Sequence, residues 1–124
     1  MPRVVHFDIK ADEPESLKTF YEKVFKWRFD KWNDPSGQIE YYLIKTGDDE
    51  PGIDGGLAKR MSPEDQMDVT IGVINIDQYI KKIEENGGKI TSPKMAIPGI
   101  GWILNFTDPQ GNKYVLMEDD PNAH

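Results

Sequence analysis

Two short stretches of the sequence carry polar side chains that could contact a ligand. They alternate with apolar residues: His6, Asp8 and Lys10 with Val5, Phe7 and Ile9, and Asp68, Thr70 and Gly72 with Val69, Ile71 and Val73. Alternate residues of a strand point to opposite faces, so each stretch is expected to have one apolar and one polar face. The polar face indicates a wet or liganded cavity, with solvent exposure as the alternative, since half-solvated sheets are common.

Two amphipathic helices are expected to flank these strands. Pro14 can open a helix at about 14–25, capped by Asp12 or Glu13, and Asn75 with Gln78 forms a capping-box pattern for a second helix at about 77–86. Each helix should pack on a sheet through a stripe of apolar residues: Leu17, Phe20, Tyr21 and Val24 in the first, and Ile76, Tyr79, Ile80 and Ile83 in the second.

The remaining strands follow from turn signals. Strands are expected at 28–32, 39–45 and 53–58, the last interrupted by Gly55-Gly56, which indicates a bulge or a close approach of the backbone to another group. A short strand near 89–91 precedes a hairpin, in which runs 102–106 and 114–117 flank Asp108-Pro109-Gln110-Gly111-Asn112.

Both halves of the chain therefore run strand, helix and three strands. This order predicts an α+β fold of tandem βαβββ modules in one domain, residues 1–124, with module one at 1–60, a polar connector at 61–66 and module two at 67–124. Two such curved sheets, closed side by side into a barrel-like arrangement with outer helices, would form a cleft suited to a small molecule.

Composition narrows the class of partner. The 124 residues carry a formal net charge of −7, which disfavours binding to nucleic-acid phosphates, and contain no cysteine for a disulfide or a thiolate zinc site. No apolar run approaches the length of a membrane span, and the N-terminus lacks the long apolar segment of a signal peptide. We expect a soluble cytoplasmic protein that does not bind nucleic acid or membrane.

The chain resembles the glyoxalase/bleomycin resistance/extradiol dioxygenase group, the vicinal oxygen chelate superfamily, and within it the lactoylglutathione lyase-related branch. The resemblance covers nearly the whole chain. It rests on the tandem βαβββ order and on four segments: V-V-H-F-D-I, F-Y-E-K-V-F-K-W, I-E-E-N-G-G-K-I, and I-P-G-I-G-W followed by F-T-D-P-Q-G-N.

The resemblance implies positions for metal ligands on the first and last strand of each module. His6 matches the first position and Asp68 the corresponding position of module two, whereas the last-strand positions match Val115 and a site near Asp54 or Gly55. Val115 cannot ligate a metal, and two donors are too few for a tight catalytic site. The expected cofactor is therefore at most a weakly bound divalent ion, nickel, zinc, manganese or iron, held by His6 with Asp68 or Asp54.

Two functions fit this resemblance. The first is a cleft that has lost its metal chemistry and binds or sequesters a small molecule, as in the bleomycin-resistance branch. The alternative is a metal-dependent lyase, isomerase or dioxygenase of the lactoylglutathione lyase type. The expected substrate-binding residues are His6, Asp8, Thr70, Trp102 and Asn105, although strand aromatic residues such as Trp102 more often belong to a core.

The resemblance also implies a homodimer, because a second chain often completes the cleft in this family. The large aromatic load of module one could supply part of the interface: Phe20, Tyr21, Phe25, Trp27 and Trp32.

Overall fold

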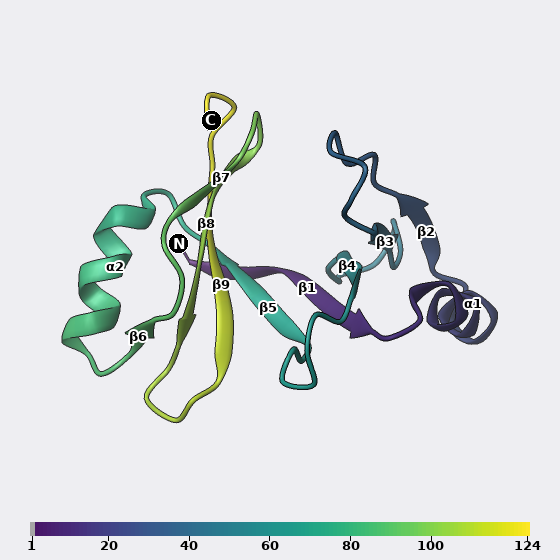
Figure 1. Ribbon diagram of the computed structural model, residues 1–124, viewed down its shortest axis with the longest axis horizontal. Helices are drawn as coiled ribbons and strands as arrows, with labels where there is room; N and C mark the ends of the chain where they lie inside the picture. The colour runs from purple at the N-terminus through teal and green to yellow at the C-terminus, as the bar shows by residue number, and fades with distance from the viewer. Residues whose placement is uncertain (1) are drawn as a thin grey trace. The chain divides into compact units, whose positions relative to one another are not determined.

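The structure, a computed structural model, describes residues 2–124. The chain divides into two compact units. We call His6–Met67 the N-terminal unit, and residues 2–5 together with Asp68–His124 the C-terminal unit. Strand β1 (Arg3–Ala11) contributes its first residues to the C-terminal unit and the rest to the N-terminal unit. Figure 1 labels the elements of both units.

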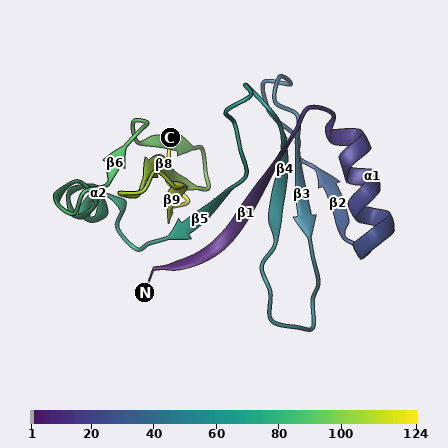
Figure 2. The ribbon, with the colours of Figure 1, turned by 90° about the horizontal axis from the view of Figure 1, so that it is seen from below.

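The N-terminal unit contains one helix and a mixed sheet. After β1 come α1 (Pro14–Phe25), β2 (Arg28–Lys31), β3 (Tyr41–Lys45) and β4 (Gly55–Lys59). The strand order is β2-β3-β4-β1, with β4 parallel to β1 and the other pairs antiparallel. Figure 2 shows α1 next to β2. This is the predicted βαβββ module.

One face of this sheet and α1 enclose the core of the unit. The buried members are Ile9, Ala11, Tyr42, Ile44 and Leu57. Only part of the predicted helical stripe joins them: Leu17 and Tyr21 pack against the core, whereas Phe20 and Val24 are about half exposed, at 51% and 53%. The helix begins at Pro14 as expected, but Glu13 at the cap position makes no side-chain capping bond, so proline geometry supports this end more than a cap does.

The C-terminal unit repeats the same arrangement. It contains β5 (Asp68–Gly72), α2 (Ile76–Glu85), β6 (Lys89–Ile90), β7 (Met95–Ile97), β8 (Gly101–Thr107) and β9 (Lys113–Asp119). The order is β6-β8-β9-β5, with β5 parallel to β9; the first residues of β1 lie beside β5, and β7 pairs with β8. Apart from the additional β7, the strand order matches that of the N-terminal unit. This confirms the tandem βαβββ fold.

The second helix forms for the reasons expected from the sequence. The Asn75 side chain accepts a hydrogen bond from the backbone N–H of Gln78, and Gly87 has a φ of 91°, a conformation that favours glycine. The apolar stripe of α2 packs on a core of Val73, Ile76, Leu104, Phe106 and Leu116. Figure 1 shows α2 beside β6.

Neither unit closes its strands into a barrel, because the described strands end on an edge strand, β2 in one unit and β6 in the other. Of the two forms expected for the fold, a curved sheet or a barrel, each unit therefore has an open sheet. Among residues 2–124, no helix is both long enough and apolar enough to cross a membrane.

Candidate functional site

Three polar side chains of the N-terminal unit form one hydrogen-bonded cluster on the sheet face opposite α1. The Tyr41 hydroxyl lies 2.9 Å from Nε2 of His6 and 2.7 Å from Oδ1 of Asp8. His6 Nε2 also lies 3.4 Å from the same carboxylate oxygen, and the two side chains are 29% and 18% exposed. We call these residues the His6–Tyr41–Asp8 cluster.

The chemistry of the three groups fixes the direction of the hydrogen bonds. Burial raises the pKa of Asp8, but hydrogen bonds from His6 and Tyr41 and the nearby charges bring that pKa below its ordinary value, so the carboxylate is ionised and can only accept. Tyr41 therefore donates to Asp8, and the tyrosine oxygen accepts from Nε2–H of His6. The second imidazole nitrogen, Nδ1, makes no hydrogen bond to any residue among 2–124.

Gly56 gives Tyr41 the room to reach this position. Tyr41 lies opposite Ala58 in the β3–β4 register, and its ring leans along the sheet across Gly56 to place the hydroxyl beside Asp8. A Cβ atom on Gly56 would overlap the end of the tyrosine ring and would lie 2.5 Å from Oδ1 of Asp8. Any other residue at position 56 would displace the cluster.

The neighbouring Gly55 allows a similarly close approach on the opposite face of the sheet. A Cβ on Gly55 would lie 2.7 Å from two atoms of the Phe7 ring. The two glycines form regular parallel pairs with Phe7 and Asp8, so the close approach expected at Gly55-Gly56 exists and involves side chains of this chain.

Apolar side chains flank the cluster. The Trp32 ring meets the Tyr41 ring edge to face, with ring centroids 6.4 Å apart. The backbone N–H of Trp32 donates to the backbone carbonyl of Tyr41 at 2.9 Å. Leu43, opposite Gly56 and on the same face as Tyr41, is 46% exposed. The face around His6 thus combines hydrogen-bonding atoms with an aromatic and an aliphatic wall.

A network of charged residues holds the connector 61–66 to the ends of β1 and β4. Lys10 Nζ lies 2.7 Å from Oδ1 of Asp65, and the other Asp65 oxygen accepts from the Met61 N–H at 3.0 Å. Arg60 donates to the carbonyls of Asp65 and Lys10 and pairs with Asp12 at 3.2 Å. The connector is therefore fixed to the sheet of this unit.

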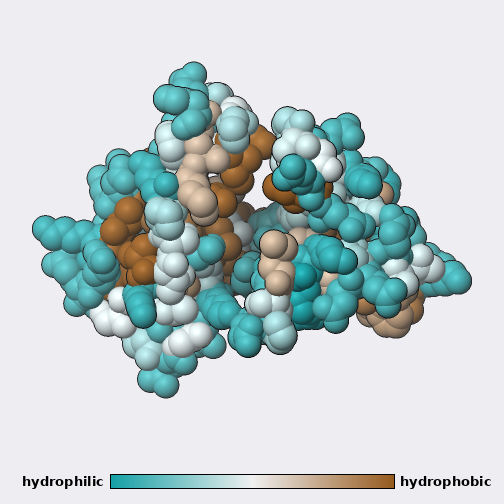
Figure 3. Space-filling view, viewed as in Figure 1, coloured by the Kyte–Doolittle hydropathy of each residue, from teal (hydrophilic) through white to brown (hydrophobic). Residues whose placement is uncertain are grey.

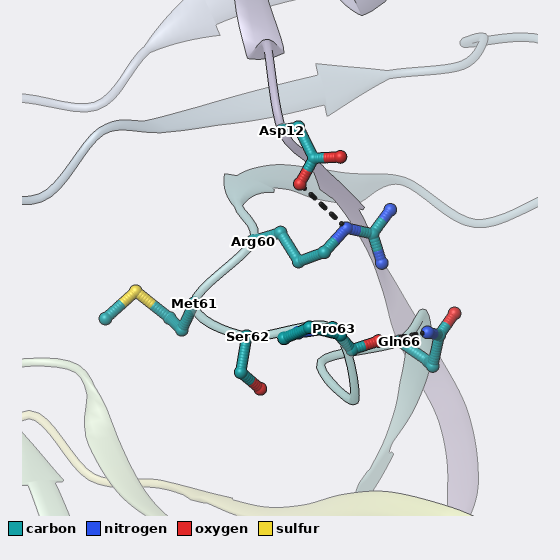
Figure 4. Close-up of a pocket in the computed structure, with 6 residues that line it drawn as sticks. All are labelled: Asp12, Arg60, Met61, Ser62, Pro63 and Gln66. Carbon is teal, nitrogen blue, oxygen red and sulfur yellow. Dashed lines mark hydrogen bonds and ion pairs between the residues drawn. The ribbon is translucent and has the colours of Figure 1, made fainter.

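A surface pocket of about 590 Å³ lies beside this connector, lined by Asp12, Arg60, Met61, Ser62, Pro63 and Gln66 (Figure 4). Its one cationic group, Arg60, already donates to Asp12 and to two backbone carbonyls, and Gln66 donates to the Pro63 carbonyl. Because its main polar groups are engaged within the protein, we regard the His6–Tyr41–Asp8 cluster as the stronger site.

The predicted residues of the C-terminal unit do not all share one face. Thr70 and Asn105 both lie opposite Val115 in the register, so these three form a row across β5, β9 and β8. Thr70 is only 4% exposed, whereas the Asn105 side chain is exposed. In this row Val115 on β9 lies between Thr70 and Asn105.

Trp102 lies on the other face, three positions from Asn105. It packs against the α2 core, donates from Nε1 to Asp120 at 2.9 Å, and carries the Lys94 ammonium 4.8 Å above its ring. These contacts give Trp102 a packing role and separate it from Asn105.

The residues present do not fit the metal site implied by the resemblance. Among residues 2–124, no three His, Asp or Glu side chains come together as a metal-binding group. His6 Nε2 is engaged by Tyr41, Asp54 accepts from the Thr46 N–H and pairs with Lys45, and Val115 is apolar. Asp68, the second expected ligand, is half-buried at the start of β5 in the C-terminal unit.

Sequence reasoning missed Tyr41, Gly56 and Trp32 as parts of the site. The stretch Tyr41-Tyr42-Leu43-Ile44 does not alternate in polarity, so nothing local indicates which tyrosine faces the core. The structure buries Tyr42 and directs Tyr41 to His6. The available signal was the Gly55-Gly56 pair, which indicated a close approach without naming the approaching group.

Comparisons with known proteins agree with this fold. The sequence profile of the Glyoxalase/Bleomycin resistance protein/Dioxygenase superfamily matches residues 3–116. Protein CFP32 of Mycobacterium bovis and of Mycobacterium tuberculosis, whose name assigns it provisionally to the glyoxylases, is 26% identical over 116 residues. The match covers 92% of this chain and 43% of the relative, so the chain spans less than half the length of the curated relatives it matches.

Solved structures show the same fold at low sequence identity. The hypothetical protein BH1468 from Bacillus halodurans superposes with a TM-score of 0.71 at 18% identity, covering 99% of this chain and 98% of that one. Methylmalonyl-CoA epimerase from Mycobacterium tuberculosis gives 0.70 at 12% identity, covering 95% and 88%. At these identities the likeness concerns the fold alone.

Proposed function

Because the chain belongs to the glyoxalase/bleomycin resistance protein/dioxygenase superfamily, we propose that it binds or sequesters a small molecule on the polar face of the N-terminal sheet, without a metal ion. The observation that carries this proposal is the His6–Tyr41–Asp8 cluster. Its three polar groups satisfy one another, yet His6 keeps one nitrogen without a hydrogen bond to residues 2–124 and 29% of its side chain exposed.

The surroundings of the cluster suit a small organic ligand. Trp32 and Leu43 supply apolar contact area, and binding sites for small molecules combine such walls with a few oriented polar groups. Asp8 and the net charge of −7 disfavour an anionic ligand group next to the carboxylate.

The alternative, a metal-dependent lyase, isomerase or dioxygenase, rests on one observation, the position of His6 on the first strand of its module. A metal ion at Nε2 would have to displace the Tyr41 hydroxyl, which lies 2.9 Å away, and an ion at Nδ1 would find no group of three His, Asp or Glu side chains among residues 2–124. The donor set therefore supports binding over metal-dependent catalysis.

A fragment screen tests the proposed function. A library of uncharged polar and aromatic compounds is screened by thermal shift against the wild-type protein and His6→Ala, since a ligand that binds the native state raises its melting temperature. We expect compounds that stabilise the wild type and lose their effect in His6→Ala. Compounds that stabilise both proteins equally would contradict the proposal that ligands bind at His6. A screen in which no compound stabilises the wild type would contradict it as well.

We further propose a homodimer in the cytoplasm. Three apolar residues on α1, Phe20, Val24 and Phe25, are 51%, 53% and 56% exposed, which is more apolar surface than a solvated helix needs. Brown and tan atoms are visible on the surface at the α1 end of the molecule in Figure 3. A second copy of the chain is the occupant proposed for this surface.

A further inference from the structure

We infer that His6 is held as the Nε2–H tautomer by Tyr41 and Asp8, and that its Nδ1 atom selects ligands that donate a hydrogen bond, from a hydroxyl or an uncharged N–H group. This inference rests on the proposed function, because it names the ligand class of the same site. His6 is the ligand-contacting group in this assignment, and Tyr41 and Asp8 are positioning residues.

The Asp8 carboxylate sets the direction of both hydrogen bonds. Asp8 accepts the Tyr41 hydroxyl at 2.7 Å, which leaves the tyrosine oxygen facing His6 Nε2 at 2.9 Å as an acceptor. A neutral imidazole carries one N–H and one lone pair. If Nε2 carries the proton, the lone pair lies on Nδ1.

Position on the sheet keeps this arrangement in place. The Tyr41 ring passes over Gly56 and meets Trp32 edge to face, so the hydroxyl has little freedom to turn away from Asp8. His6 and Asp8 are two residues apart on one strand and share a face, with Nε2 3.4 Å from the carboxylate. The imidazole therefore offers a ligand an acceptor and not a donor.

The consequence is a specificity rule. A hydroxyl or N–H group can donate a hydrogen bond to the lone pair of Nδ1. The oxygen of an ether or a carbonyl in the same place has only lone pairs and is repelled by it. A carboxylate meets both that lone pair and the negative charge of Asp8. A neutral hydrogen bond corresponds to about a fivefold difference in affinity between a donor and its donor-free analogue.

The tautomer is measured first, on the full chain without ligand. The chain has only two histidines, His6 and His124, so long-range proton–nitrogen NMR of the ¹⁵N-labelled imidazoles gives two resolvable sets, and His124→Ala assigns them. At about pH 8, where free imidazole side chains are neutral, we expect His6 as the Nε2–H tautomer. Tyr41→Phe should shift His6 toward a mixture and leave His124 unchanged. A wild-type His6 in the Nδ1–H form would overturn the inference even if the variant failed to fold.

Ligand selection is measured next with the matched pair phenol and anisole, and with benzoate. We expect phenol to perturb the His6 signals and to bind about fivefold more tightly than anisole, benzoate to bind more weakly still, and folded Tyr41→Phe to lose the preference. Equal binding of phenol and anisole at His6 would overturn the inference but leave the proposed function standing. If neither compound perturbs His6, both are overturned.

Discussion

The side chain of Tyr41, on β3, lies across Gly56, on β4, and a Cβ atom at position 56 would overlap the end of the tyrosine side chain. A polar cluster formed by β1 and β3 therefore depends on a residue without a side chain on β4, the strand between them. Gly56 also stands beside Asp8 in the register, so the absent side chain leaves room for the hydroxyl that joins Asp8 to His6.

Gly56→Ala is expected to destabilise the protein by about 1–3 kcal/mol, the usual cost of adding a methyl group to a tightly packed position. The added Cβ must move Tyr41 or Asp8, so His6 should lose its hydrogen bond as well. Urea unfolding measures the first effect, and the imidazole NMR signals of His6 measure the second.

Gly52→Ala is the matched control, because a Cβ at position 52 meets nothing within 4 Å. It should change stability by less than about 0.5 kcal/mol. In the double variant Gly56→Ala with Tyr41→Ala, part of the loss should be recovered, since the clashing ring is gone. Equal effects of the two alanine substitutions would contradict the packing described for Tyr41.

Asp65→Asn should weaken the attachment of the connector. Burial raises the pKa of Asp65, but its bonds from Lys10 and Met61 and the charge of Arg60 hold that pKa below its ordinary value. A carboxylate with a lowered folded-state pKa stabilises the protein above its unfolded pKa, near 3.9, and this contribution is lost as pH falls through the folded-state pKa. At pH 7 we expect a loss of about 1–2 kcal/mol.

The pH series provides the check on this prediction. The difference between Asp65→Asn and wild type should shrink below about pH 4. Asp30→Asn, which removes an exposed carboxylate 3.7 Å from Arg28, should have little effect at any pH. A constant Asp65→Asn effect from pH 7 to pH 2 would mean that the charge of Asp65 is not its source.

Trp102→Phe separates a packing role from a binding role. The substitution removes the N–H that donates to Asp120 and part of the surface beneath Lys94. We expect a stability loss of about 1 kcal/mol or more, from the hydrogen bond and the lost contact area, and unchanged phenol binding at His6. Loss of binding without loss of stability would restore the prediction that Trp102 contacts the ligand.

The regular part of the fold was predictable because its signals are local. Pro14 and Asn75 mark the starts of the two helices, and the observed helices, Pro14–Phe25 and Ile76–Glu85, differ from the predicted ranges by one residue at most at each end. The alternation in β1 and β5 likewise predicts that Phe7, Ile9, Ile71 and Val73 face the cores, whereas Val5, predicted on the same face as Phe7 and Ile9, is 48% exposed. The short strand β7 was not predicted, since Met95–Ile97 lies between two prolines and carries no periodic pattern.

The site was only partly predictable because it depends on register between distant strands. His6 and Asp8 follow from alternation within one strand, but their link to Tyr41 requires the pairing of β1, β4 and β3. Trp102 shows the same limit, because an aromatic residue in a strand fits either face until its partners are known. Membership of the lactoylglutathione lyase-related branch, and the roles of Thr70 and Asn105, stay predictions.

The proposed homodimer predicts a solution mass of twice the 14.2 kDa chain at micromolar concentration. Replacing exposed Val24 with lysine should favour the monomer, because it places a charge in the apolar surface of α1. Lys23→Ala, on the same helix, serves as the control. Light scattering that gives only the single-chain mass for the wild type would exclude the dimer.

The most direct test of a metal-free His6–Tyr41–Asp8 cluster is the metal content of protein purified without chelator, measured by elemental analysis in wild type and His6→Ala. Nickel, zinc, manganese and iron are measured together, and thermal shifts with each ion provide an independent reading. Because no three His, Asp or Glu side chains among residues 2–124 come together around His6, we expect far less than one equivalent of any ion, with no difference between the two proteins. One tightly bound equivalent per chain, lost in His6→Ala, would contradict the binding-site account and favour the metal-dependent enzyme.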